Sequence, residues 1–118
     1  MSAAGYFRPR TLSEALTYLA ENAAGTEIVA GGTDVMVDLR AGAITPECLL
    51  DVSRLEPLRE IALTAEGLAV GAAVTIAEIQ RSPLIKTHAP ALQKSTVNFA
   101  SQQIRNVATI GGNVAHCS

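Results

Sequence analysis

Residue types that mark particular classes of protein are scarce in this 118-residue chain. It has no tryptophan, and tyrosine and phenylalanine each occur twice. Its nine basic and eleven acidic residues are interspersed and give a net charge of −2. Nucleic-acid binding relies on a basic surface and on aromatic side chains that stack on bases, so the sequence gives it little support. A bound phosphate would have to be held mainly by the backbone.

Cysteine and long apolar runs are also scarce. Cys48 and Cys117 lack a CxxC spacing, so we expect no disulfide framework and no zinc or iron–sulfur site. No apolar run approaches the roughly 18 residues of a membrane-spanning helix, and the first residues lack the features of a signal peptide. We therefore expect a cytoplasmic protein without a membrane span. The hydrophobic content of 48% is enough for one small folded domain.

The chain opens with an extended segment and a helix. Pro9 disfavours helical backbone at the residue before it, so residues 6–10 are expected to be extended. Thr11 and Glu14 have the spacing of a capping box, in which each side chain bonds the other residue's backbone N–H. Apolar residues follow at helical spacing on one face, which predicts a helix at 12–22.

Two short apolar runs around a helix then indicate an α/β fold. They predict strands at 27–30 and 48–52, and the residues from Val35 to near Gly42 predict a short helix between them. A strand, a helix and a second strand of these lengths form a compact βαβ unit. The first part of the chain is therefore expected to be a small subdomain with a parallel sheet.

A second sheet is expected to begin with a β-hairpin. Residues 59–64 and 68–74 predict its strands, and Gly67 occupies a turn position where positive φ is expected. We place the boundary between two subdomains near residues 53–57. The fold class is thus α/β (α+β), with a βαβ-type subdomain at 1–54 and the start of a second, mixed-sheet subdomain at 55–118.

Helices follow the hairpin. Thr75 and Glu78 repeat the capping-box spacing and open a helix that stops before Pro83, because proline cannot continue a helix interior. A further helix is expected at 89–97, with its proline in the first turn.

Two adjacent glycines follow the strand at 27–30. The sequence Ala30-Gly31-Gly32-Thr33-Asp34 has no Cβ at its centre to keep a ligand away from the backbone. Free N–H groups of the turn and of the next helix could bind a phosphate. The motif is equally typical of a tight turn in which Thr33 or Asp34 caps the helix.

A second glycine pair lies near the end of the chain, in Thr109-Ile110-Gly111-Gly112-Asn113. It again combines paired glycines with small polar donors. Two such turns, distant in sequence, could face one another across a diphosphate. The chain has neither the glycine pattern of a Rossmann NAD site nor that of a P-loop.

Together with the lead-in Ile104-Arg105-Asn106, the two motifs resemble the flavin motifs of the FAD-binding subunits of molybdenum hydroxylases. This family includes the medium subunit of aerobic carbon monoxide dehydrogenase and the FAD-binding part of xanthine dehydrogenase. The resemblance implies a vanillyl-alcohol-oxidase-like fold with FAD extended between two subdomains. It covers the whole chain but less than half of a family member, so we expect a truncated fold that lacks the flavin-ring end of the site.

The resemblance also implies which residues contact the cofactor. Paired glycines would let backbone N–H groups approach the diphosphate, while Thr33, Thr109 and Asn113 would add side-chain donors. Asp34 would repel a diphosphate and is expected to cap a helix or accept a ribose hydroxyl. Phe99 could serve either the cofactor or the core. The full set is Val29, Ala30, Gly31, Gly32, Thr33, Asp34, Val35, Phe99, Thr109, Gly111, Gly112 and Asn113.

Neither a catalytic residue nor a metal site is expected in this chain. His116 and Cys117 are adjacent, but two ligands do not complete a zinc site. Arg105 could bind a phosphate, a partner subunit or backbone carbonyls. Thr33-Asp34 stands where related flavoproteins often carry a histidine that tethers the cofactor, which favours non-covalent FAD.

The implied function is that of an electron-transfer module in a molybdenum-containing dehydrogenase. FAD would receive electrons from the iron–sulfur clusters of a partner and deliver them to NAD or a quinone. The expected partners are a molybdenum-cofactor subunit and an iron–sulfur subunit, with a second copy of the chain as a further possibility. The isolated chain is expected to be inactive. The alternatives are a cofactor-free docking or assembly domain and an FAD-dependent oxidase of the same fold.

Overall fold

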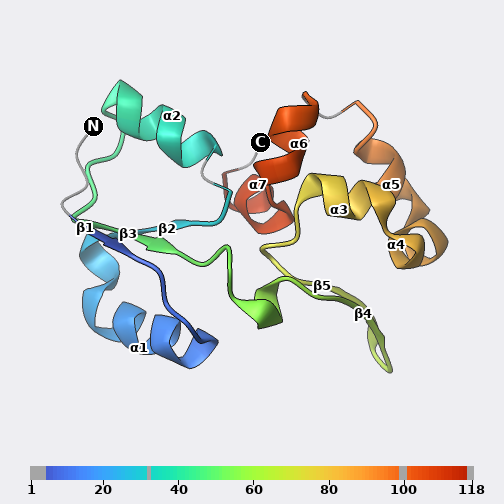
Figure 1. The fold of residues 1–118 in the computed structure, drawn as a ribbon, viewed down its shortest axis with the longest axis horizontal. Coiled ribbons are helices and arrows are strands. Elements are labelled where there is room, and N and C mark those ends of the chain that lie inside the picture. The colour runs from blue at the N-terminus through green and yellow to red at the C-terminus, as the bar shows by residue number, and fades with distance from the viewer. Residues whose placement is uncertain (1–4, 32, 99–100, 117–118) are drawn as a thin grey trace.

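The computed structural model describes residues 5–31, 33–98 and 101–116, with the side chains of residues 33–35 left out of the description. The chain forms an elongated body of 43 × 31 × 19 Å. Figure 1 shows a sheet with its two flanking helices at one end and a hairpin with a group of short helices at the other. Both the parallel sheet and the hairpin predicted from the sequence are present, so the α/β fold class is confirmed.

The first sheet has three parallel strands in the order β1-β3-β2. They comprise β1 (Gly5–Phe7), β2 (Thr26–Val29) and β3 (Cys48–Asp51), with β3 in the centre. The βαβ unit formed by β2, α2 and β3 is confirmed. The opening segment, expected only to be extended, is in addition a strand that pairs with β3.

Helix α1 (Leu12–Asn22) covers one face of this sheet, and α2 (Thr33–Ala41) lies on the other side (Figure 1). The hydroxyl of Thr11 accepts a hydrogen bond of 3.1 Å from the N–H of Glu14, which is half of the predicted capping box. The carboxylate of Glu14 accepts from the N–H of Arg10, at 3.4 Å, instead of from Thr11. A short 3-10 turn, Ala23–Gly25, follows α1. Gly42 has a φ of 75° just after α2, so it ends that helix in the left-handed conformation that glycine adopts readily.

The second sheet is an antiparallel hairpin of β4 (Ile61–Thr64) and β5 (Gly67–Val70). Gly67 has a φ of 134°, which confirms the predicted positive value. A 3-10 turn at Glu56–Leu58 precedes the hairpin, and Leu55, only 1% exposed, anchors this connection in the interior. The strands are shorter than the predicted runs.

Three short helices pack beside the hairpin: α3 (Ile76–Arg81), α4 (Pro83–His88) and α5 (Pro90–Ser95). The capping box of Thr75 and Glu78 is complete. The predicted stop before Pro83 is also correct, but α4 begins there at once because the Ser82 hydroxyl accepts from the N–H of Ile85 at 3.3 Å. Proline at the first helical position suits this start.

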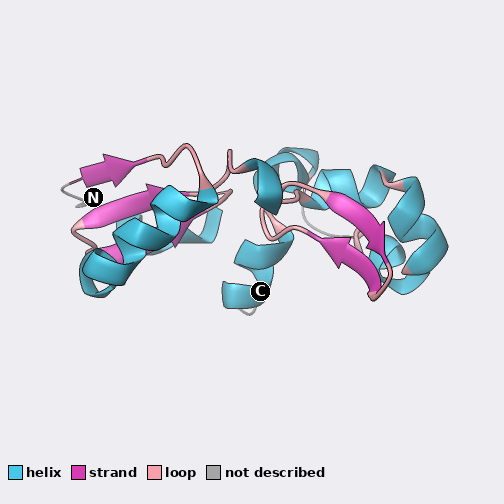
Figure 2. Ribbon diagram, turned by 90° about the horizontal axis from the view of Figure 1, so that it is seen from below, coloured by secondary structure: helices cyan, strands magenta, loops and turns pink. Residues whose placement is uncertain are grey.

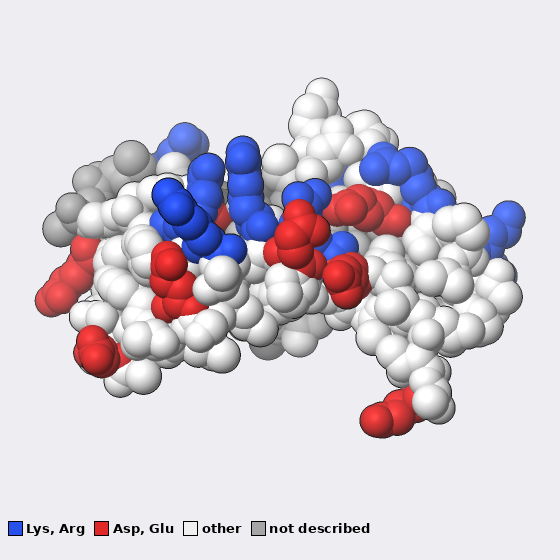
Figure 3. Space-filling model, turned by 60° about the horizontal axis from the view of Figure 1, so that its bottom comes forward, with Lys and Arg blue, Asp and Glu red and all other residues white. Residues whose placement is uncertain are grey.

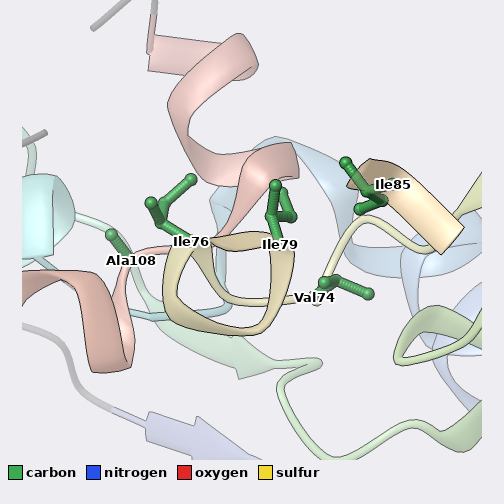
Figure 4. Close-up of a cluster of buried hydrophobic side chains, with 5 residues drawn as sticks. All are labelled: Val74, Ile76, Ile79, Ile85 and Ala108. Atoms are coloured by element: carbon green, nitrogen blue, oxygen red, sulfur yellow. The ribbon is translucent and has the colours of Figure 1, made fainter. Parts of the chain in front are cut away.

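A cluster of buried apolar side chains lies among these helices (Figure 4). It consists of Val74, Ile76, Ile79, Ile85 and Ala108, each at most 7% exposed. A fully buried aliphatic side chain contributes roughly 1.5–3 kcal/mol to folding. Ala108 comes from the segment between α6 (Gln102–Val107) and α7 (Ile110–His116), so the core holds the end of the chain in place.

Viewed from below, the parallel sheet and the hairpin lie apart at opposite ends of the molecule, each beside its own helices (Figure 2). On the face drawn in Figure 3, basic and acidic side chains are mixed, as the near-neutral charge suggested. Among the described residues, no helix is both long enough and apolar enough to cross a membrane.

Candidate functional site

The first glycine motif lies at the carboxyl end of β2. Val29, the last residue of this strand, is in register with Asp51 at the end of β3, and both Val29 and Ala30 are half-buried. Gly31 forms a bend, and α2 begins two residues later at Thr33. Ligands of open α/β sheets bind beyond the carboxyl ends of the parallel strands, where helix N-termini supply N–H groups.

Several predicted site residues have no described side chain. Gly32 and Phe99 lie outside the described residues. Thr33, Asp34 and Val35 are described only as the first backbone turn of α2, which begins two residues earlier than the predicted start at Val35. The predicted role of each in binding a cofactor stays a prediction.

The second glycine motif is a helix start rather than a free turn. The Thr109 hydroxyl accepts from the N–H of Gly112 at 3.1 Å, and the Thr109 carbonyl accepts from the N–H of Asn113 at 3.0 Å. Gly111 and Gly112 form the first turn of α7, a helix that the sequence analysis did not predict. Thr109 itself is only 3% exposed.

The backbone N–H groups of Gly111 and Gly112 already have hydrogen-bond partners within the chain. The N–H of Gly111 donates to the carbonyl of Ala72 at 2.9 Å, and the N–H of Gly112 is bound to Thr109. Neither is free to bind a phosphate in this structure. The side chain of Asn113 is half-buried on the same turn, so its amide is more accessible to a ligand than the two backbone N–H groups.

The glycines are required by close packing. A Cβ on Gly31 would overlap the carbonyl oxygen of Val107, and a Cβ on Gly111 would lie 2.7 Å from both the Cβ and the carbonyl oxygen of Ala72. The positive φ values found among the described glycines belong to Gly42 and Gly67. Glycine is needed at positions 31 and 111 because a side chain would not fit, and not because the backbone has a positive φ there.

The contact between Gly31 and Val107 brings the two motifs together. Val107 ends α6 and precedes Thr109 by two residues, so the second motif starts beside the first. Figure 1 shows the end of β2 next to the red α6–α7 segment near the middle of the molecule. An ion pair of 3.3 Å between Asp38 of α2 and His116 of α7 also spans the two helices when the imidazole is protonated.

The residues around this contact suit an anionic ligand. Each motif leads into a helix, and the N-terminal N–H groups of α2 carry the positive end of its dipole. The Asn113 side-chain amide is a neutral donor on the neighbouring segment, while the buried Thr109 hydroxyl bonds the turn itself. A diphosphate ester fits this set, because amides and helix dipoles bind phosphate without a basic side chain.

A carboxylate at the same sheet edge was missed by the sequence analysis. Asp51 is 7% exposed and accepts hydrogen bonds from the Tyr6 hydroxyl and from the backbone and hydroxyl of Ser53, at 2.9 and 2.6 Å. Arg8 lies 3.4 Å from its second oxygen. Burial raises the pKa of Asp51, but the bonds from Ser53 and Tyr6 and the charge of Arg8 outweigh it and hold the pKa below its usual value. Local spacing gives no signal for this cluster, because it joins two segments that are more than forty residues apart.

The described residues hold no group of three or more histidine, cysteine, aspartate or glutamate side chains that could bind a metal. His116 bonds Asp38, and Cys117 lies outside the described part of the chain. The guanidinium of Arg105 donates a hydrogen bond to the side-chain oxygen of Gln80.

Comparison with known proteins gives a consistent result. The family described as "FAD binding domain in molybdopterin dehydrogenase" matches residues 2–118. The xanthine dehydrogenase FAD-binding subunit of Escherichia coli O157:H7 is 37% identical over 114 residues, which are 96% of this chain and 39% of that protein. The nicotinate dehydrogenase FAD-subunit of Eubacterium barkeri is 34% identical over 96% of this chain and 38% of its own length.

The fold is likewise found in a solved structure. Carbon monoxide dehydrogenase from Hydrogenophaga pseudoflava superposes with a TM-score of 0.91 and 28% identity, over 97% of this chain and 40% of the matched chain. The present chain therefore spans about two fifths of the length of these relatives.

Proposed function

The chain belongs to the family of FAD-binding domains of molybdopterin dehydrogenases, and we propose that it binds FAD through its two glycine motifs. The cofactor is held non-covalently. The observation that carries the proposal is the contact of Gly31 with Val107, because it places the helix starts that follow the two motifs beside one another.

The diphosphate of FAD is assigned to the N-terminal turn of α2 and the neighbouring first turn of α7. The N-terminal N–H groups of α2 attract its charge. Asn113 donates from the amide of its side chain, and Thr109 keeps the turn in place through its bonds to Gly112 and Asn113. The remaining residues of this proposed contact set are Val29, Ala30, Gly31, Gly32, Thr33, Asp34, Val35, Phe99, Gly111 and Gly112.

Bound FAD would supply the redox chemistry, and the residues of the chain would bind and orient it. We propose that the domain serves as an electron-transfer module between the iron–sulfur clusters of a partner subunit and an acceptor such as NAD or a quinone. A molybdenum-cofactor subunit is the other expected partner. Cytoplasmic localisation belongs to the same proposal.

A flavin titration tests the binding step. Purified chain is titrated with FAD while the flavin fluorescence is followed, and saturation at one FAD per chain is expected. Asn113→Ala should weaken binding about tenfold to hundredfold, since a hydrogen bond to a charged group contributes about 1.5–3 kcal/mol. Asn22→Ala is the matched control, because Asn22 lies at the end of α1 and its side chain donates to the carbonyl of Tyr18. An unsaturable signal would leave the cofactor-free docking domain as the better description.

A further inference from the structure

Arg105 lies on α6, the helix that leads into the second glycine motif. Its Nη1 donates a hydrogen bond of 3.2 Å to Oε1 of Gln80 on α3. The backbone carbonyl of Gln80 accepts a second bond, of 3.1 Å, from Nε2 of Gln93 on α5. Gln80 thus links α6 to α3 through its side chain and α3 to α5 through its backbone.

The position of α6 determines the contact between the two motifs. The helix ends at Val107, whose carbonyl oxygen lies against Gly31. The next carbonyl, of Ala108, accepts from the N–H of Ile76 at 2.9 Å. A small rotation of α6 about the Ala108–Ile76 hydrogen bond would change the distance between the Val107 carbonyl and Gly31. A rotation in one direction separates them, and a rotation in the other is blocked because the two already touch.

Arg105 is a poor source of stability for its own helix. Its Nε is buried and has no hydrogen-bond partner among the described residues. Leaving a buried donor unpaired has a cost that offsets the gain from one hydrogen bond. Replacing the guanidinium with an apolar chain of similar length should therefore change the unfolding temperature little, although it removes the tie between α6 and α3.

We propose that Arg105 and Gln80 are positioning residues for the FAD site. They act together through α6 and set the spacing between Val107 and Gly31, and with it the distance between the helix starts that hold the diphosphate. The proposal rests on the proposed FAD binding. It assigns no direct contact between Arg105 and the cofactor.

The test is a double-mutant cycle with Arg105→Met, Gln80→Leu and the double variant. Gln80→Leu leaves the backbone carbonyl that Gln93 bonds and leaves the charge of Arg105 in place. Each single change should raise the Kd for FAD about tenfold, and the double change should raise it no further, because both remove the same interaction. Gln103→Met is the control, since Gln103 is exposed on the same helix.

A second measurement needs no cofactor. Hydrogen exchange at the amide of Ile76, which bonds the carbonyl of Ala108, should be faster to the same extent in both single variants. Additive effects on Kd, or an effect of Arg105→Met alone, would show that the arginine acts by its charge and would overturn the proposal. Unchanged exchange in both variants would also overturn it. If the parent chain binds no FAD, the proposed function fails, while the exchange rates still decide whether the pair positions α6.

Discussion

The carbonyl oxygen of Val107 lies where a side chain of Gly31 would begin. These two residues belong to segments that are far apart in sequence, one just after strand β2 and the other at the end of α6. Because the contact is between backbone atoms of Gly31 and Val107, a change of side-chain rotamer cannot relieve it. The contact therefore fixes how closely the two glycine motifs approach one another.

Gly31→Ala should separate the two motifs. The new Cβ overlaps the Val107 carbonyl, so the backbone must shift, and overpacking of this kind destabilises a protein by about 1–3 kcal/mol. FAD affinity should fall with it. Urea unfolding and flavin titration measure the two effects. Gly5→Ala is the control, since a Cβ there meets its neighbours at ordinary distances of 3.6–3.9 Å. Equal stability of both variants would contradict the close contact.

The two glycines of the second motif should respond differently to alanine. A Cβ on Gly111 lies 2.7 Å from the backbone of Ala72, whereas a Cβ on Gly112 meets only the Thr109 hydroxyl, at 3.0 Å. Gly111→Ala should destabilise the chain by about 1–3 kcal/mol. Gly112→Ala should be close to neutral. Alanine gains about 0.5–1 kcal/mol over glycine inside a helix, and this gain offsets the cost of the close contact with the Thr109 hydroxyl. Thermal unfolding of the two variants makes the comparison, and the reverse order would refute the packing argument.

Local capping signals predicted much of the fold. Thr11 and Thr75 each precede a glutamate by three residues, and both begin helices as expected. Gly67 marked the hairpin turn. Such signals work because the bonds concerned join residues three or four apart, so the sequence contains both partners.

Long-range packing explains what was missed. β1 is only three residues long and is held by pairing with β3, more than forty residues away. The Gly111-Gly112 pair was interpreted as a turn, yet it is helical because Gly111 packs on Ala72 and donates to its carbonyl. Two adjacent glycines disfavour a helix locally, so only the tertiary contact accounts for this one.

Asp51 should make the stability of the chain depend on acid pH. Its folded pKa lies below its usual value because the bonds from Ser53 and Tyr6 and the charge of Arg8 outweigh the effect of burial. The stability it contributes is therefore fully present above the unfolded pKa of about 3.9 and is lost as the pH falls through the folded pKa. Asp51→Asn should lower the free energy of unfolding by about 1–3 kcal/mol at neutral pH.

The difference between the parent chain and Asp51→Asn should shrink as the pH is lowered below about 4. Urea unfolding at a series of pH values measures it. Glu66→Gln, on the exposed hairpin turn, is the control and should leave the curve unchanged. A difference that is constant with pH would mean that Asp51 acts by packing and not by charge.

FAD should bind more tightly than FMN. The two motifs are assigned to the diphosphate, and FMN lacks both the second phosphate and the adenosine half of FAD. We expect a preference of about tenfold or more, equivalent to at least 1.4 kcal/mol.

ADP should compete with FAD, because it carries the diphosphate and the adenosine, and riboflavin should compete poorly. Competition titrations with the three ligands measure this order. The Gly31→Ala variant should lose part of the preference, since it alters the spacing between the motifs. Equal affinity for FAD and FMN, together with no competition from ADP, would mean that the glycine motifs serve only the packing of the two segments.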